Sequence, residues 1–216
     1  MIKELYPFVQ AYAFIIGLAI GSFLNVIIYR IPNNKSIVKP RSKCTGCETQ
    51  ISWYDNIPVL SYVLLLGKCR NCKASISVRY PLIEFICGLM TVMLLSIYGI
   101  SYEFFVIVLF CYMLIAITFI DIDHFIIPNE FIIFGLIVSF FAHAFNFLPI
   151  SIVQGFYGII AFGGTLFVMG ALGTWAFKKE ALGFGDVKLG LVLGSFLGVE
   201  LSLLSLFLSF IFAAIM

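Results

Sequence analysis

Four cysteines in the first third of the chain have the spacing of metal ligands. They form two C-x-x-C pairs separated by 21 residues: Cys44 with Cys47, and Cys69 with Cys72. Paired knuckles at this spacing are typical of a closed, tetrahedral zinc site. The alternatives are disulfides, which a reducing cytoplasm disfavours, and a redox pair, which normally uses a single C-x-x-C. We therefore expect a structural zinc ion that also supplies folding energy to this segment.

Three aspartates stand at the ends of long apolar runs: Asp121, Asp123 and Asp186. A carboxylate in such a place costs free energy, so each is a functional candidate. Two carboxylates within hydrogen-bond reach share one proton and can then act together as base and acid, as in aspartic proteases. A pair made of Asp186 and one member of the other two therefore predicts peptide-bond hydrolysis at a membrane surface.

The local sequence limits how these aspartates can be used. Asp121 and Asp123 are two residues apart, which on a helix turns them about 200° from each other, so only one can face a given partner. Gly183 and Gly185 make a loop that can adopt positive φ and allow a close approach of backbone, which suits an aspartate that must be aimed. Helix capping is the alternative role for Asp186. Lys188 is expected to mark the cytoplasmic boundary of the apolar run that follows Asp186.

The elements that must position these residues are apolar helices. Hydrophobic residues make up 62% of the chain and charged residues 11%, against about 45–50% and about 25% in soluble domains. A membrane-spanning helix needs about 20 apolar residues, and seven apolar runs qualify as spans: 9–28, 82–97, 104–120, 131–148, 155–177, 187–199 and 201–216. The last two are divided at Glu200, because a carboxylate at mid-membrane costs about 2.5–3.5 kcal/mol. The seventh run is short, so the chain is expected to be truncated at its end.

The basic residues predict the orientation. Nine of the 13 Lys and Arg residues fall between Arg30 and Arg79, where Glu48 and Asp55 are the only acidic residues. Because cytoplasmic loops collect Lys and Arg, this segment is expected to be cytoplasmic, together with the loops that hold the aspartates. The predicted organisation is a first span at 1–30, a four-cysteine zinc segment at 31–80 and a membrane-embedded protease domain at 81–216.

Short motifs along nearly the whole chain resemble those of bacterial prepilin peptidases. In the amino-terminal part these are GSFLNV at 21–26, YRIP at 29–32, the two cysteine pairs, WYDNIP at 53–58, GKC at 67–69 and RYP at 79–81 with Glu84. In the remainder they are DIDH at 121–124 with Pro128, and GFGDVK at 183–188. The compact cysteine segment is similar to that of competence-type pseudopilin processors.

The resemblance implies an all-α, polytopic aspartic protease of the bacterial inner membrane, of the GxGD type. Such enzymes remove the basic leader of type IV prepilin or pseudopilin precursors on the cytoplasmic side. It implies Asp121 and Asp186 as the catalytic pair, with Asp123 as a companion of the motif. Many members also methylate the new amino terminus with S-adenosylmethionine, and Gly67 matches a glycine linked to that activity. The family has eight spans and a Phe-Gly-Pro motif in its last part, which this chain does not reach.

The expected partners are a prepilin-like precursor and the lipid bilayer, with no nucleic acid. Two other functions fit the same residues. One is a cation or proton transporter that uses Asp121 and Asp186 as ion sites, although transport sites usually lie near the membrane midplane. The other is a non-catalytic assembly scaffold whose zinc segment docks partners.

Overall fold

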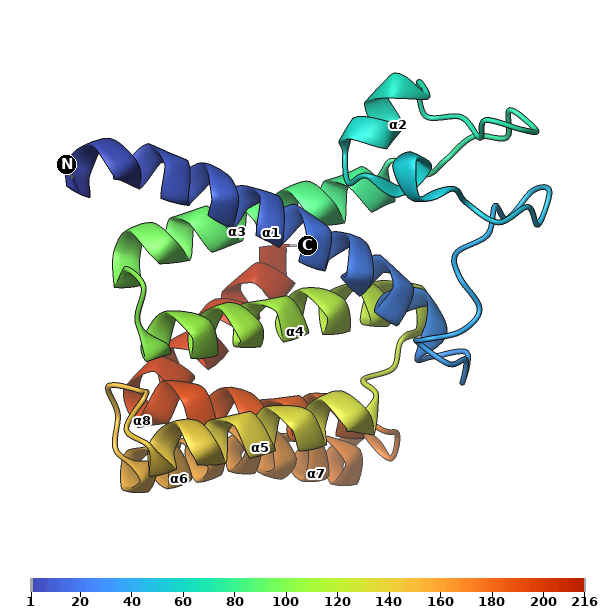
Figure 1. Ribbon diagram of the computed structural model, residues 1–216. Helices are drawn as coiled ribbons and strands as arrows, with labels where there is room; N and C mark the ends of the chain where they lie inside the picture. The colour runs from blue at the N-terminus through green and yellow to red at the C-terminus, as the bar shows by residue number, and fades with distance from the viewer. Residues whose placement is uncertain (1, 216) are drawn as a thin grey trace. The chain divides into compact units, whose positions relative to one another are not determined.

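Two compact units, Met1–His124 and Phe125–Met216, make up the chain. The computed structural model describes the backbone of residues 2–215 and the side chains of residues 5–215, and these residues form helices joined by short loops and one long polar segment (Figure 1). Residues 1 and 216, which end the predicted 1–30 and 81–216 segments, lie outside the described residues. Each unit is described by itself.

The first unit contains three long helices, α1 (Ile2–Arg30), α3 (Arg79–Tyr98) and α4 (Tyr102–His124). Glycine permits a close approach of α1 to α3, since a Cβ at Gly17 would lie 2.7 Å from the Cys87 carbonyl oxygen. Asn25 adds a polar link, because its side-chain amide donates to the Tyr80 carbonyl at 3.1 Å. Small residues at such positions are the usual means of packing helices in a membrane.

The polar segment between α1 and α3 contains only short helices, η1 (Trp53–Asn56) and α2 (Leu60–Leu64). Two isolated antiparallel bridges join Lys43 to Gln50 and Lys68 to Ser75. Its buried residues are the small Ser61 and Gly67, so no large apolar side chain of this segment forms a core. The segment therefore needs anchors other than hydrophobic burial.

The second unit contains α5 (Asn129–Ala144), α6 (Ile152–Ile159), the π-helical η2 (Ile160–Gly164), α7 (Thr165–Phe177) and α8 (Phe184–Ile215). The elements α6, η2 and α7 run on as one apolar stretch that packs along α8 (Figure 1). At the contact, a Cβ on Gly158 would come within 2.1 Å of the Gly194 carbonyl oxygen. Neither position has room for a side chain.

The all-helical membrane architecture is confirmed, with a different division of its last part. Five described helices are long and apolar enough to cross a membrane, and α5 is a shorter apolar helix. The runs expected at 187–199 and 201–216 lie in α8 as two helical parts that meet at a break at Gly198. There φ is 68°, a left-handed value that glycine adopts without steric cost. The break thus lies two residues before Glu200.

His143 links α5 to α8 near the break in α8. Its side chain is buried in α5, with Nε2 2.8 Å from the Ser195 carbonyl oxygen and Nδ1 3.2 Å from the Ile150 carbonyl oxygen. The Ser195 carbonyl lies in the last turn before Gly198. The imidazole therefore contacts α8 next to the point where its backbone departs from helical geometry.

Gly158→Ala tests the contact between α6 and α8. Because the new Cβ would lie 2.1 Å from a carbonyl oxygen, we expect a loss of about 1–3 kcal/mol in stability, measured as a lower Tm in detergent. Gly164→Ala is the matched control, since its nearest neighbouring atom is 3.8 Å away and alanine favours helix over glycine by about 1 kcal/mol. Equal losses in both variants would contradict the assignment.

Candidate metal centre and candidate active site

The two cysteine pairs form matching backbone knuckles. In each, the amide of the first cysteine donates to the carbonyl five residues later, at 2.9 Å for Cys44 and 2.8 Å for Cys69. The residue after the second cysteine donates back to the first, at 2.9 Å from Glu48 and 3.1 Å from Lys73. These two residues also share a left-handed φ, of 55° and 60°. The repeated turn directs both pairs of sulfurs toward one point.

The sulfur atoms fit a tetrahedral metal ion. All four Sγ atoms lie within 4.8 Å of one another, and those of Cys44 and Cys72 are 3.7 Å apart. Zinc–sulfur bonds of about 2.3 Å at tetrahedral angles place sulfurs about 3.8 Å apart. Hydrogen bonds with Thr49 lower the pKa of Cys47 to about 6, which favours the thiolate that binds metal. The predicted ligand set is therefore compatible with a structural zinc site.

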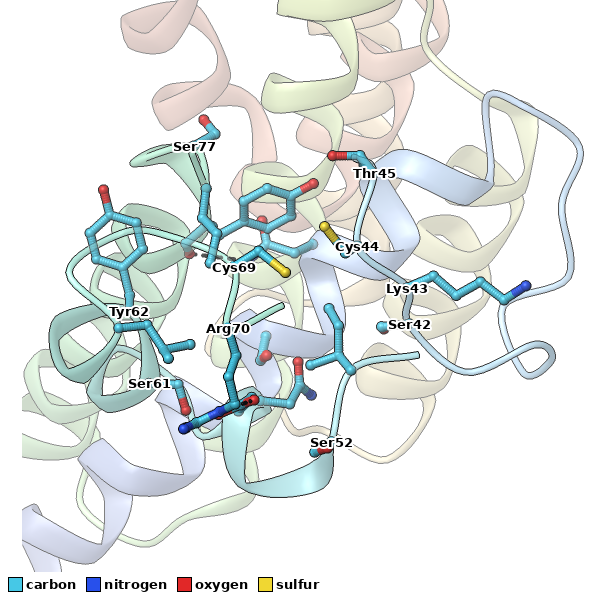
Figure 2. A pocket seen from close by; sticks show the side chains of 18 of the residues that line it. Ser42, Lys43, Cys44, Thr45, Ser52, Ser61, Tyr62, Cys69, Arg70 and Ser77 are labelled. Atoms are coloured by element: carbon cyan, nitrogen blue, oxygen red, sulfur yellow. Dashed lines mark hydrogen bonds and ion pairs between the residues drawn. The ribbon is translucent and has the colours of Figure 1, made fainter. Parts of the chain in front are cut away.

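An ion pair braces the second knuckle against η1. Arg70, which follows Cys69, donates from Nη2 to Asp55 Oδ1 at 2.6 Å and from Nε to Asp55 Oδ2 at 2.9 Å (Figure 2). These hydrogen bonds hold the pKa of Asp55 below its usual value. The bidentate geometry fixes the direction of the arginine as well as its position.

Gly67 occupies a position that a side chain cannot share. Its φ is 67°, and a Cβ there would lie 2.9 Å from the Tyr62 hydroxyl. Its carbonyl also accepts the Ile76 amide at 2.7 Å, which closes the loop that holds the second knuckle. The structure thus gives Gly67 a local conformational role beside the methylation link that the resemblance implies.

The paired aspartates of α4 differ in their surroundings. Asp123 forms an ion pair with Arg79, the first residue of α3, and Arg79 Nη2 also donates to the Phe119 carbonyl at 3.0 Å. This arrangement ties the end of α4 to the start of α3. Asp121 is exposed and lies about 200° around the helix from Asp123. It therefore faces away from the side on which Arg79 binds.

Asp186 lies in the first turn of α8, where it is exposed. Its amide donates to the Gly183 carbonyl at 3.1 Å. Neither Gly183 nor Gly185 uses the left-handed backbone that glycine allows. A Cβ on Gly183 would lie 3.2 Å from Asp186 Oδ2. A side chain at position 183 would crowd the Asp186 carboxylate, which gives a reason for the glycine there.

Lys188 has a structural partner in the second unit. Its Nζ donates to Asn129 Oδ1 at 2.8 Å and lies 4.9 Å from the centre of the Phe184 ring. This contact joins the first turn of α8 to the first turn of α5. Asp121 and Asp186 belong to different units, and their pairing stays a prediction.

A cavity of about 520 Å³ in the first unit had no counterpart in the sequence analysis. It is bounded by both knuckles, by the loop around η1 and α2, and by the facing ends of α1 and α3 (Figure 2). Glu84 lies on its wall and is buried. In the sequence, Glu84 is distinguished only by its place beside the RYP motif at 79–81. A single glutamate in an apolar run does not indicate which residues its side chain contacts.

Apolar spanning helices combined with a four-cysteine module define the chain as a multi-pass membrane protein. Residues 15–98 match the Bacterial Peptidase A24 N-terminal domain, and residues 108–216 match the Type IV leader peptidase family. The chain belongs to the type IV leader peptidase family, which confirms the resemblance and indicates an inner-membrane location.

Curated relatives can be aligned with most of the chain. Proteins named "Prepilin leader peptidase/N-methyltransferase" are 37% identical in Myxococcus xanthus, over 88% of this chain and 57% of that protein, and 32% identical in Stutzerimonas stutzeri, over 94% of this chain and 78% of that protein. A "Type 4 prepilin-like proteins leader peptide-processing enzyme" of Escherichia coli is 35% identical, over 84% of this chain and 74% of that protein. The chain spans little more than half the length of the Myxococcus relative. No solved structure matches it.

A double-mutant cycle tests the separate roles of the two α4 aspartates. Arg79→Gln and Asp123→Asn should be coupled by up to about 1 kcal/mol in unfolding free energy, since each removes the same partly exposed ion pair. Arg79→Gln and Asp121→Asn should be additive. Coupling of Arg79 to Asp121 in place of Asp123, measured by denaturation in detergent, would contradict the geometry.

Proposed function

We propose that this protein is an aspartic endopeptidase that removes the leader from type IV prepilin or pseudopilin precursors, with Asp121 and Asp186 as its catalytic pair. The family match over residues 108–216, which contains both aspartates, is the observation that supports this most directly. The names of the curated relatives support the same substrate class.

The proposed chemistry needs one proton shared between the two carboxylates. The ionised member takes a proton from a water molecule as that water attacks the scissile carbonyl, and the protonated member donates a hydrogen bond to the carbonyl oxygen. Asp123 is held by Arg79, which leaves Asp121 as the free member of the α4 pair to meet a partner. The space beside Gly183 would let the Asp186 carboxylate turn without a steric clash.

We further propose that the chain methylates the newly exposed amino terminus, with S-adenosylmethionine as the methyl donor. The relatives named N-methyltransferases and the match to the N-terminal domain at 15–98 support this second activity. The four cysteines would hold zinc as a structural ion, because four thiolates leave no open coordination position for a substrate. Gly67 would serve methylation by shaping the loop against Tyr62.

The proposed orientation places the zinc segment and the catalytic aspartates on the cytoplasmic face. The excess of Lys and Arg between Arg30 and Arg79 supports it. A precursor with a basic leader and an apolar helix would then lie with its scissile bond at the inner membrane surface.

Substitution of each aspartate tests the peptidase. Asp121→Asn and Asp186→Asn should each lower the rate of leader removal from a purified precursor by about a hundredfold or more, because each removes one half of the acid–base pair. Asp123→Asn is the matched control and should retain cleavage. The measurement is the mass of the precursor after incubation, and cleavage at the parent rate by either of the first two variants would refute the proposed pair.

Metal analysis tests the zinc ligands. We expect about one zinc ion per chain in the purified protein, and its loss in Cys44→Ser, because a structural zinc site binds with about 10–16 kcal/mol of free energy that one missing thiolate reduces sharply. Cys111→Ser, which changes a single cysteine of α4, should keep the metal. A Cys44→Ser variant with a full complement of zinc would exclude this ligand set.

A further inference from the structure

The cavity of the first unit has the size of a small-molecule site. Its volume of about 520 Å³ falls within the range of about 300–1,000 Å³ that is usual for ligand and cofactor sites. Tyrosines from α1, η1, α2 and α3 line it, namely Tyr29, Tyr54, Tyr62 and Tyr80. Their rings offer flat apolar surfaces with a polar group at one end, which suits a ligand that is partly planar and partly polar.

Three polar side chains on the cavity wall are more than nine-tenths buried. Asn25, Ser61 and Glu84 are 8%, 7% and 8% exposed. Two of them fix the walls, since Asn25 links α1 to α3 and the Ser61 hydroxyl donates to the Tyr54 carbonyl at 2.8 Å. The site is therefore built from residues that already hold its framework.

Glu84 is the charged member of this group. Its Oε2 accepts the Val59 amide at 2.7 Å. Val59 has a φ of 59°, a rare value for a β-branched residue. Strained residues of this kind persist where the surrounding structure fixes them, and they gather at functional sites.

No cation of the described residues pairs with Glu84. Of the cations that line the cavity, Arg70 is bound to Asp55, Arg30 donates to the carbonyls of Ser36 and Pro40 at 2.7 and 2.6 Å, and Lys43 is an exposed residue that forms no ion pair with Glu84. The other ion pair in this part of the chain joins Arg79 to Asp123. A buried carboxylate without a counter-charge is costly, and a cationic ligand would lower that cost.

We propose that this cavity is the methyl-transfer site and that Glu84 binds a primary ammonium group of a reactant. The inference rests on the proposed methylation, in which two reactants carry such a group. One is the methionine part of S-adenosylmethionine, and the other is the new amino terminus of the cleaved precursor. Glu84 is a binding residue in either case, because its carboxylate faces the ammonium directly.

The test measures, by calorimetry, the affinity of the full chain in detergent for each of two ligands. S-adenosylhomocysteine keeps the ammonium group of the donor, and an apolar hexapeptide amide with a free amino terminus stands in for the cleaved precursor. Glu84→Gln should weaken one of these two ligands by about tenfold or more, since a hydrogen bond between two charged groups is lost. Glutamine can still accept the Val59 amide, so zinc content and Tm should stay at the parent values.

Two controls separate charge from structure. Glu48→Gln makes the same charge change on an exposed residue of the zinc segment that does not line the cavity, and should leave both affinities unchanged. The N-acetylated hexapeptide lacks the ammonium, so its affinity should be the same in the parent and in Glu84→Gln.

The outcomes decide both the site and the source of the cation. Weaker binding of S-adenosylhomocysteine alone assigns Glu84 to the methyl donor, and weaker binding of the free-amine peptide alone assigns it to the precursor. Unchanged affinity for both ligands overturns the proposal. If Glu84→Gln fails to fold, the test uses Ser77→Cys, which places a thiol on the cavity wall. A ligand in the cavity should slow the reaction of this thiol with a maleimide, so labelling that neither ligand slows would also overturn the proposal. Leader cleavage by the parent protein, measured in parallel, reports on the proposed peptidase independently.

Discussion

The bilayer's intolerance of unpaired polar groups determines where this protein can keep its chemistry. Among the described residues, buried polar side chains of the helices have partners, as when His143 contacts the Ser195 carbonyl near the break in α8, and Ser202 Oγ is the exception. The aspartates of functional interest instead occupy helix ends. Asp121 and Asp123 end α4, and Asp186 lies in the first turn of α8. The helices of each unit thus act as supports whose ends present reactive groups.

The zinc segment has no apolar core of its own, so other contacts must hold it together. Its two knuckles repeat one hydrogen-bonding pattern, and four sulfurs meet where a metal ion would join them. Further anchors come from the bidentate pair of Arg70 with Asp55 and from the Glu84 carboxylate on α3. These contacts lie around the segment and do not fill its middle. The cavity between the knuckles and the ends of α1 and α3 is the space that they leave.

The two aspartates of α4 illustrate how tertiary contacts divide similar residues between roles. They share a motif and a helix, and only the resemblance to a known family distinguishes them in the sequence. The ion pair between Arg79 and Asp123 gives one of them a structural partner, while the helical turn directs Asp121 elsewhere. The geometry therefore leaves Asp121 as the member of the pair available for the proposed catalytic role.

The sequence by itself determined the membrane class and the family, and it predicted the metal ligands and the candidate aspartates. These depend on local patterns, namely the length of apolar runs, the C-x-x-C spacing and short motifs. Only the tertiary structure decided the partner of Asp123, the space beside Asp186 that explains Gly183, the break at Gly198 and the cavity at Glu84. Each of these depends on atoms from segments distant in the chain, whose approach is fixed by packing and hydrogen bonding that no local pattern encodes.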